Sequence, residues 1–226
     1  FITSTSYSLA QNLVDSMKVE VICKDNNLKE LLGITPVSYE DAIKEAFEKI
    51  ELNQVPSSWK DALTSNTLND GISHYAEVPV NGCYFDYRKL HINDIEKVLN
   101  KIWSIGGSNG WYYSNWLWVI RGFIDKLFGG VGLRRGRKNQ NEISPGEALD
   151  FWRVLIADKT EKRLLLFAEM KLPGEAWLEF RIDNNNVLHQ TATFRPLGLW
   201  GRLYWYSVLP FHGFIFRGMI RNIALK

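Results

Sequence analysis

The sequence predicts an α+β fold in which an antiparallel sheet is wrapped around a long C-terminal helix. Four strand-like runs follow one another, at residues 149–157, 163–171, 176–183 and 187–195. The connectors between them, DKTEK, LPGE and NNN, are short and rich in turn-forming residues, which favours hairpins. The apolar run at residues 199–224 predicts a helix, bent at Pro210, that one face of the sheet would bury.

The segment before these strands predicts one more strand and two helices. Residues 83–92 are typical of a strand, and Asn93 opens a helix that extends to residue 105. The GGSNG sequence that follows predicts a turn. A very aromatic helix is expected at residues 116–128, ended by Gly129 and Gly130. The expected order is β-α-α-β-β-β-β-α, with a further strand near residues 133–137.

The first part of the chain has a different, α/β pattern. A helix is expected at residues 8–17, and the β-branched run KVEVICK predicts a short strand. Ser38, with Asp41 three residues later, predicts the start of another helix. A polar stretch of small residues then indicates a linker. We therefore divide the chain into residues 1–65, a linker at 66–76, and a second domain at 77–226.

Composition excludes several classes of protein. The 226 residues are 46% hydrophobic, which is enough for a sizeable core. The 27 basic and 25 acidic residues give a net charge of +2, whereas nucleic-acid-binding proteins usually carry a strong basic excess. Two cysteines in unlike contexts form neither a disulfide framework nor a zinc motif, so we expect a cytoplasmic protein without a metal site. The density of aromatic residues indicates a thick core, a ligand cavity or an interface.

No segment predicts integral insertion into a membrane. Three charged residues interrupt the apolar run at 111–128, namely Arg121, Asp125 and Lys126. The run between Arg202 and Arg217 is shorter than the about 20 residues that a span requires. The chain begins with Phe1 rather than methionine and shows no signal peptide, which is consistent with a part of a longer protein.

The stretch GGVGLRRGR combines glycines with arginines, as phosphate-binding loops do. A dinucleotide-binding loop, however, follows a strand and opens a helix, whereas these glycines follow a helix. The stretch is typical of a helix C-cap that turns into a strand. Two alternatives stay open. One is an anion site formed by Arg134, Arg135 and Arg137, and the other is contact with nucleic acid.

Several runs together resemble a known family. They are GGSNGWYYSNWLWVIRGFIDKLFGGVGLRRGR, LDFWRV, AEMKLPGEAWLEF and QTATFRPLGLWGRLYW followed by PFH. Residues 77–226 resemble a C-terminal domain of unknown function in bacterial proteins of the atypical short-chain dehydrogenase/reductase class. In those proteins it follows an NAD(P)-binding Rossmann domain. Residues 1–65 resemble the end of that Rossmann domain, with PVSYEDAIKEAF as its late helix.

The resemblance implies a helix-grip fold for residues 77–226, similar to START and polyketide-cyclase-like proteins, which generally enclose a hydrophobic pocket. It also implies an upstream Rossmann domain as partner and NAD(P) as a cofactor of the full-length protein. This chain lacks the glycine-rich nucleotide loop, so no cofactor is expected in it. The catalytic residues of an oxidoreductase would lie upstream of Phe1.

Strand alternation supplies the candidate site residues. Glu179 is expected opposite Gln190, as a buried polar network or a pair that orients a ligand. The predicted pocket lining is Trp152, Glu179, Gln190, Trp205 and His212. The weaker catalytic candidates are the carboxylates of Asp150, Glu169 and Glu179. His189 is isolated in the sequence, and four aromatic residues near the second helix are interpreted as core: Trp111, Tyr112, Trp116 and Trp118.

Three functions remain open. The leading hypothesis is an accessory domain that binds an apolar or aromatic small molecule and is not itself catalytic. The second is a cyclase- or hydrolase-type enzyme that uses the buried carboxylates. The third is a structural domain whose aromatic residues dock against the Rossmann domain or against a second copy in a homodimer. The ligand, the reaction and the oligomeric state do not follow from the sequence.

Overall fold

A computed structural model describes residues 7–20, 27–51, 75–133, 137, 139 and 141–225. The chain divides into two compact units, Phe1–Pro56 and Ser57–Lys226. The predicted linker at 66–76 lies outside the described residues apart from Tyr75 and Ala76, which belong to the second unit.

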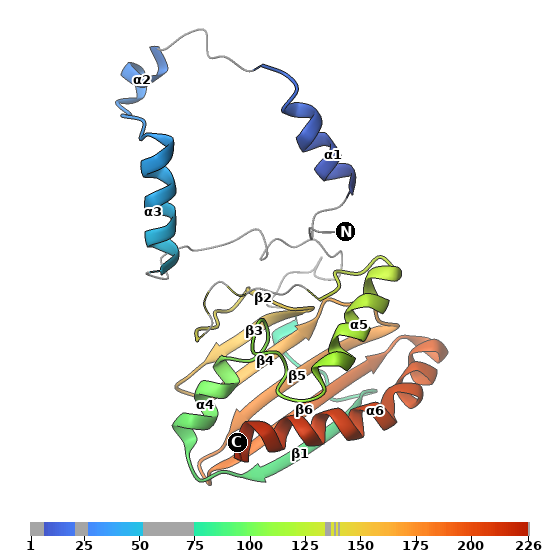
Figure 1. Ribbon diagram of the computed structural model, residues 1–226. Coiled ribbons are helices and arrows are strands. Elements are labelled where there is room, and N and C mark those ends of the chain that lie inside the picture. Colours follow the sequence, from blue (N-terminus) through green and yellow to red (C-terminus); the bar gives the residue numbers. More distant parts are fainter. Residues whose placement is uncertain are drawn as a thin grey trace. The chain divides into compact units, whose positions relative to one another are not determined.

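Three helices form the described part of the first unit: α1 (Tyr7–Ser16), α2 (Asn27–Leu32) and α3 (Tyr39–Glu51) (Figure 1). Ser38 begins α3 as predicted, because its hydroxyl accepts a hydrogen bond of 3.1 Å from the Asp41 amide. The sequence analysis missed α2. Residues 18–20 of the predicted strand form turns and a bend after α1, and residues 21–24 lie outside the described residues. The Rossmann origin of this unit therefore stays a prediction.

The second unit has the predicted element order, with small changes at the ends. Its elements are β1 (Tyr84–His91), α4 (Ile95–Trp103), α5 (Asn115–Leu127), β2 (Ala148–Leu149), β3 (Trp152–Asp158), β4 (Arg163–Ala168), β5 (Gly174–Ile182), β6 (Val187–Pro196) and α6 (Gly198–Leu225). The two-residue β2 was not predicted. Asp94, not Asn93, caps α4, because its carboxylate accepts a 2.9 Å hydrogen bond from the Lys97 amide.

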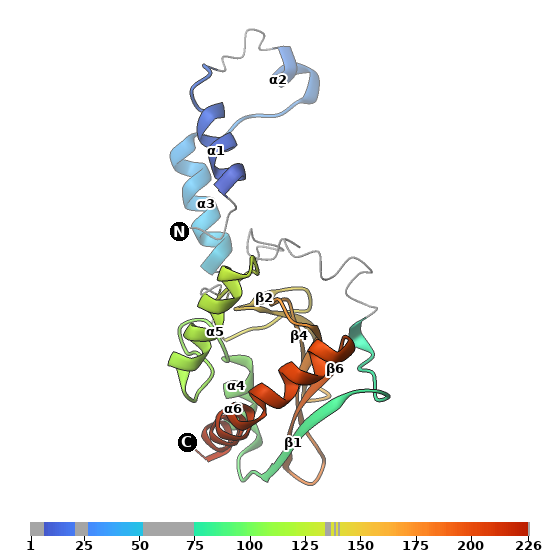
Figure 2. The same cartoon turned by 90° about the vertical axis from the view of Figure 1, so that its right-hand side faces the viewer.

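A six-stranded antiparallel sheet has the order β1-β6-β5-β4-β3-β2. Strands β2 to β6 form a meander, and β1 adds to β6 at its open edge. The segment from α4 to α5 therefore carries the chain from one edge of the sheet to the other (Figures 1 and 2). This sheet, with the C-terminal helix across it, is a helix-grip-like α+β fold.

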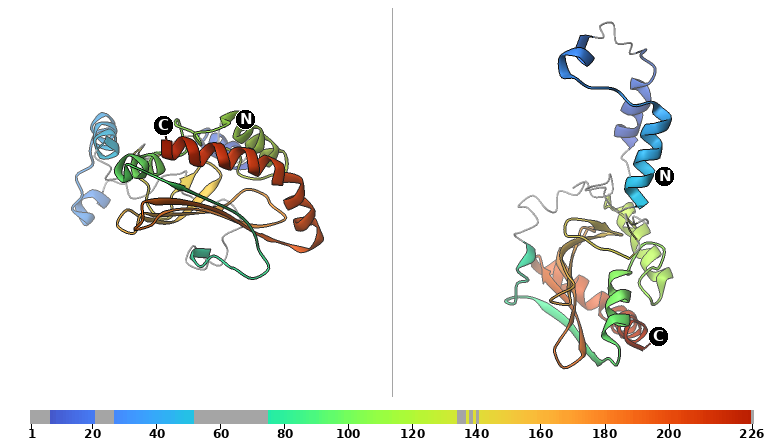
Figure 3. Two further views of the ribbon diagram at one scale, coloured as in Figure 1. Left: turned by 90° about the horizontal axis from the view of Figure 1, so that it is seen from below. Right: turned by 90° about the vertical axis from the view of Figure 1, so that its left-hand side faces the viewer.

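The two faces of the sheet are covered unequally. Helices α4, α5 and α6 lie on one face (Figure 3), and their apolar residues join the larger core with side chains such as Val154, Leu178 and Phe180. The opposite face holds a small cluster in which Tyr75 packs on Phe167, with ring centroids 4.4 Å apart. The indole of Trp177 donates a 2.9 Å hydrogen bond to the Tyr75 carbonyl oxygen.

The end of α6 is fixed against α4 and the loop that follows it. The Lys101 ammonium on α4 donates hydrogen bonds of 3.1 Å to the carbonyl oxygens of Asn222 and Ile223. These are terminal carbonyls with no partner inside the helix, and a cation there is favourable. The Asn222 amide in turn donates to the Tyr112 carbonyl oxygen at 2.7 Å. Polar contacts and buried apolar residues therefore both anchor the C-terminal half of α6.

The predicted GGSNG turn places the start of α5. Gly106 and Gly110 exchange backbone hydrogen bonds and have φ values of 83° and 65°, which glycine adopts most easily. The Asn115 side chain accepts a 2.9 Å hydrogen bond from the Trp111 amide. The Trp111 indole then stacks on Trp118, with ring centroids 4.8 Å apart. The turn thus brings the aromatic residues of this segment over the sheet.

Candidate functional site

A cavity of about 290 Å³ lies on the helix-covered face of the sheet. Its walls come from α5, from the middle of α6 between residues 204 and 216, and from strands β3, β5 and β6 with the residues after β4. The volume is near the lower end of the about 300–1,000 Å³ that is usual for small-molecule sites. Most of the residues that line it are apolar: Leu117, Trp118, Ile120, Ile124, Trp152, Met170, Leu172, Ala176, Ala192, Phe194, Trp205, Val208, Phe211, Ile215 and Phe216.

Small side chains and the shape of α6 leave this space open. Ala176 and Ala192 lie on neighbouring strands and on the face that α6 covers, where larger residues would fill the cavity. At the start of α6, Gly201 packs so closely on the Pro173 carbonyl oxygen that a Cβ atom has no room. Pro210 lies inside α6, where it removes a helical hydrogen bond, and the helix bends along its length (Figure 3).

Three polar groups in the cavity walls lack a hydrogen-bond partner among the described residues. They are the indole Nε1 atoms of Trp118 and Trp152 and the Nδ1 atom of His212, all shielded from solvent. Burial lowers the pKa of His212 to about 4, so its imidazole is neutral at pH 7. Unpaired buried donors are costly, and a bound molecule with a hydrogen-bond acceptor would satisfy them. The walls therefore combine an apolar surface with a few polar positions.

Three of the five predicted pocket residues line the cavity: Trp152, Trp205 and His212. Gln190 is buried beneath α6 but is not part of the lining, and its amide donates a 3.3 Å hydrogen bond to the Phe216 carbonyl oxygen. Glu179 lies on the opposite face of the sheet. Its register partner is Thr191, whereas Gln190 pairs with Phe180. The hairpin register differs by one residue from the predicted one, so the expected Glu179–Gln190 pair does not form.

The three candidate carboxylates each have a separate partner. The Trp111 indole donates to Asp150 at 2.8 Å. Glu169 is buried and forms a 2.7 Å ion pair with the guanidinium of Arg153. Glu179 forms a 2.6 Å ion pair with Arg163. Carboxylates that each hold a separate partner support the structure and do not form an acid–base pair directed at one substrate.

The glycine-rich stretch after α5 is a helix end. Gly129 has a φ of 75°, and the Gly130 amide donates to the Asp125 carbonyl oxygen at 2.8 Å. The buried Asp125 carboxylate accepts hydrogen bonds from the amides of Gly132, at 2.8 Å, and Lys171, at 2.6 Å. These amides are therefore not available to a phosphate. The described part of the stretch is therefore a helix C-cap, as its context predicts.

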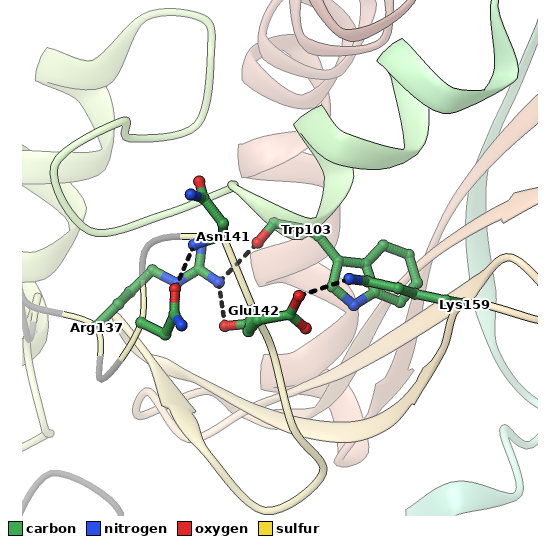
Figure 4. A network of polar contacts seen from close by, with 6 residues as sticks. Trp103, Arg137, Asn141, Glu142 and Lys159 are labelled. Carbon is green, nitrogen blue, oxygen red and sulfur yellow. Dashed lines mark hydrogen bonds and ion pairs between the residues drawn. The ribbon is translucent and has the colours of Figure 1, made fainter. Parts of the chain in front are cut away.

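The Arg137 side chain is held by hydrogen bonds within the protein (Figure 4). Its guanidinium donates hydrogen bonds to the carbonyl oxygens of Trp103, Ile105 and Glu142, at 2.7, 3.1 and 2.7 Å. Burial lowers the pKa of this guanidinium below its ordinary value. Arg137 thus fastens the loop after α5 to the end of α4. The other two residues of the predicted anion site, Arg134 and Arg135, lie outside the described residues.

Two structural features, the contacts of His189 and the exposure of Trp116, were not predicted from the sequence. His189, interpreted there as isolated, contacts the Tyr87 hydroxyl at 2.6 Å through Nδ1 and Asp183 at 2.9 Å through Nε2. The hydrogen bond from His189 is the main cause that lowers the pKa of Asp183. Trp116, interpreted as core, is 62% exposed. The helical spacing of apolar residues through α5 was a signal for this second feature, because one helix cannot bury all of its faces against one sheet.

Residues 82–219 match the model of a protein family described as "Protein of unknown function (DUF2867)". The match extends from just before β1 to the last part of α6, so it includes every wall of the cavity. No curated protein matches the chain. Within the described residues, no cluster of three or more His, Cys, Asp or Glu side chains is suited to a metal ion. None of the helices found there is long and apolar enough to cross a membrane.

Proposed function

We propose that this chain, which belongs to the DUF2867 family, binds an apolar or aromatic small molecule in the cavity between α5, α6 and the sheet. The observation that carries the proposal is a preformed space with apolar walls and only a few polar groups. Protein interiors are otherwise packed closely enough to leave few voids larger than a water molecule. A cavity of about 290 Å³ beside the core therefore points to an occupant.

The polar groups in the cavity walls indicate which kind of molecule would fit there. Trp118 and Trp152 each present an indole N–H, which can only donate a hydrogen bond. The neutral imidazole of His212 can donate or accept at Nδ1, according to its tautomer. We infer a ligand that is mainly apolar and carries at least one acceptor, such as a carbonyl, ether or hydroxyl oxygen. A strongly anionic ligand fits less well, because burial keeps His212 uncharged and the guanidinium of Arg121, which also lines the cavity, is already paired with Asp125.

Native mass spectrometry of the gently purified chain tests this proposal. We expect a small molecule bound to the wild type. Ala192→Leu, which adds a larger side chain to the cavity wall, should abolish its retention. Thr191→Leu makes a similar change on the opposite face of the same strand and serves as the matched control. Equal retention of the molecule by Ala192→Leu and the wild type would place it outside the cavity and contradict the proposal.

We propose further that the domain acts beside an NAD(P)-binding Rossmann domain in a cytoplasmic, reductase-like protein. The support is the resemblance of residues 77–226 to the domain that follows such a unit, and the weaker resemblance of residues 1–65 to its end. Sequencing the reading frame upstream of Phe1 tests this directly. A strand followed by a glycine-rich loop and a helix would support it, and an unrelated upstream sequence would contradict it.

A further inference from the structure

Helix α5 presents a continuous apolar stripe to solvent. Its exposed residues recur at the spacing of one helix face, while Trp118, Gly122 and Asp125 face the protein. The exposed fractions in this stripe range from 41% for Ile124 to 73% for Leu127 and Phe128. We name this set the α5 stripe: Trp116, Val119, Ile120, Phe123, Ile124, Leu127 and Phe128.

The first half of α6 presents a second exposed apolar set. Trp200 is 77% exposed, and Tyr206 is 60% exposed. We name this set the α6 stripe: Leu199, Trp200, Leu203, Tyr206, Leu209, Phe211 and Phe214. Single exposed apolar residues are common on protein surfaces, but two long sets on neighbouring helices indicate an interaction site.

The two stripes meet at the cavity. Ile120 and Ile124 of the α5 stripe and Phe211 of the α6 stripe line the cavity and are also exposed, at 46%, 41% and 56%. These three side chains therefore form its rim. A partner that covers the stripes would also cover the cavity mouth.

The charges on these helices identify the kind of partner. Four exposed side chains are basic: Lys126 on α5, and Arg202, Arg217 and Arg221 on α6. The only acidic residue of the two helices is Asp125, which is 1% exposed and engaged in hydrogen bonds. A partner surface that is complementary to this face of α5 and α6 is apolar and anionic. A second copy of the face is a poor match, because it would place basic residues against basic residues.

We propose that the α5 and α6 stripes dock on the surface of an anionic lipid membrane, with the cavity mouth turned towards the lipid. An apolar face beside basic residues is characteristic of segments that bind in the plane of the membrane interface. Trp116, Trp200 and Tyr206 suit that position, since tryptophan and tyrosine favour the level of the headgroups. Docking there would let an apolar molecule pass between the membrane and the cavity without crossing water. The docking surface itself does not depend on the identity of that molecule.

Sedimentation of the chain with lipid vesicles tests the proposal. The probes are vesicles of phosphatidylcholine alone and of phosphatidylcholine mixed with phosphatidylserine. We expect binding to the mixed vesicles to be at least about tenfold stronger and to weaken as salt is added. Changing Phe123 and Leu203 together to glutamate should reduce binding at least about tenfold. Val80→Glu, at an exposed position outside both stripes, should leave it unchanged.

Three results would overturn the proposal. The first is no vesicle binding by the wild type. The second is equal binding by the wild type and the Phe123→Glu, Leu203→Glu variant, whose circular dichroism would show that it is folded. The third is a stable dimer, measured by light scattering, that dissociates in that variant, because the stripes would then belong to a second copy. Lys126→Glu with Arg202→Glu provides a second check, since it should weaken binding to the mixed vesicles alone.

Discussion

The two halves of α6 lie over the same sheet but have opposite environments. In the C-terminal half, Met219, Ile220 and Ile223 are at most 4% exposed and fill the core. In the N-terminal half, only Gly201 and Trp205 are buried, and the helix borders the cavity. The difference shows that one apolar helix can fill a core at one end and border an open cavity at the other. We name these parts the filled half and the open half.

The largest expected effect is a loss of stability from truncation in the filled half. Ile223→Ala should lower the free energy of unfolding by about 2–5 kcal/mol, because it leaves a cavity among close-packed neighbours. Leu203→Ala in the open half is the matched change at a side chain that is 52% exposed, and its cost should be below about 0.5 kcal/mol. Urea denaturation measures both. Similar losses would remove the distinction between the two halves.

His212 of α6, which lines the cavity, makes the stability depend on pH. Its pKa is about 4 in the folded protein and 6.5 ordinarily, so the unfolded chain binds more protons between these values. The stability due to neutral His212 is complete above pH 6.5 and declines as the pH falls towards 4. The total loss is about 3 kcal/mol. His212→Phe should flatten this part of the profile. An unchanged profile in that variant would show that His212 is not buried in the uncharged form.

Asp125 on α5 holds the segment after α5 and the segment after β4 through hydrogen bonds, so its removal tests how strongly α5 is fixed beside the cavity. Asp125→Ala leaves the amides of Gly132 and Lys171 without their acceptor. We expect a loss of about 1.5–3 kcal/mol in the free energy of unfolding, as for hydrogen bonds to charged groups. Asp158→Ala, at an exposed hairpin, is a control that should lose less. Thermal and urea denaturation would both detect the difference.

The smallest expected effect comes from enlarging one alanine side chain in the filled core and one in the cavity wall. Ala168→Leu overpacks the filled core and should cost about 1–3 kcal/mol. Ala192→Leu extends into the cavity and should cost less than about 1 kcal/mol, because space exists for the side chain. A larger cost at Ala192 than at Ala168 would indicate that the cavity closes in solution.

Local patterns were sufficient to predict most of the second unit. The four hairpin-linked strands and the terminal helix are confirmed, because their signals come from alternation, turn residues and a long apolar run. The two-residue β2 carries too few residues for such a signal. The strand near residues 133–137 stays a prediction, because residues 134–136 lie outside the described residues and Leu133 and Arg137 are not in strands.

The site was less accessible to sequence reasoning than the fold. Trp152, Trp205 and His212 were identified because they are unusual residues on apolar elements. Glu179 was misplaced, since a register shift of one residue moves a side chain to the other face of a sheet. Ala192 was missed, because a small residue has the same pattern in a filled core. The exposed residues of α5 were missed although apolar residues occur all around that helix, which one sheet cannot bury. Only three-dimensional packing separates a cavity from a core.

The most direct test of the account is a fluorescence titration of the chain with N-phenyl-1-naphthylamine, a neutral apolar probe that emits strongly away from water. We predict saturable binding of about one probe per chain, at least about tenfold weaker in Ala192→Leu and unchanged in Thr191→Leu. The absence of saturable binding, or equal affinity in all three proteins, would contradict a ligand cavity between α5, α6 and the sheet.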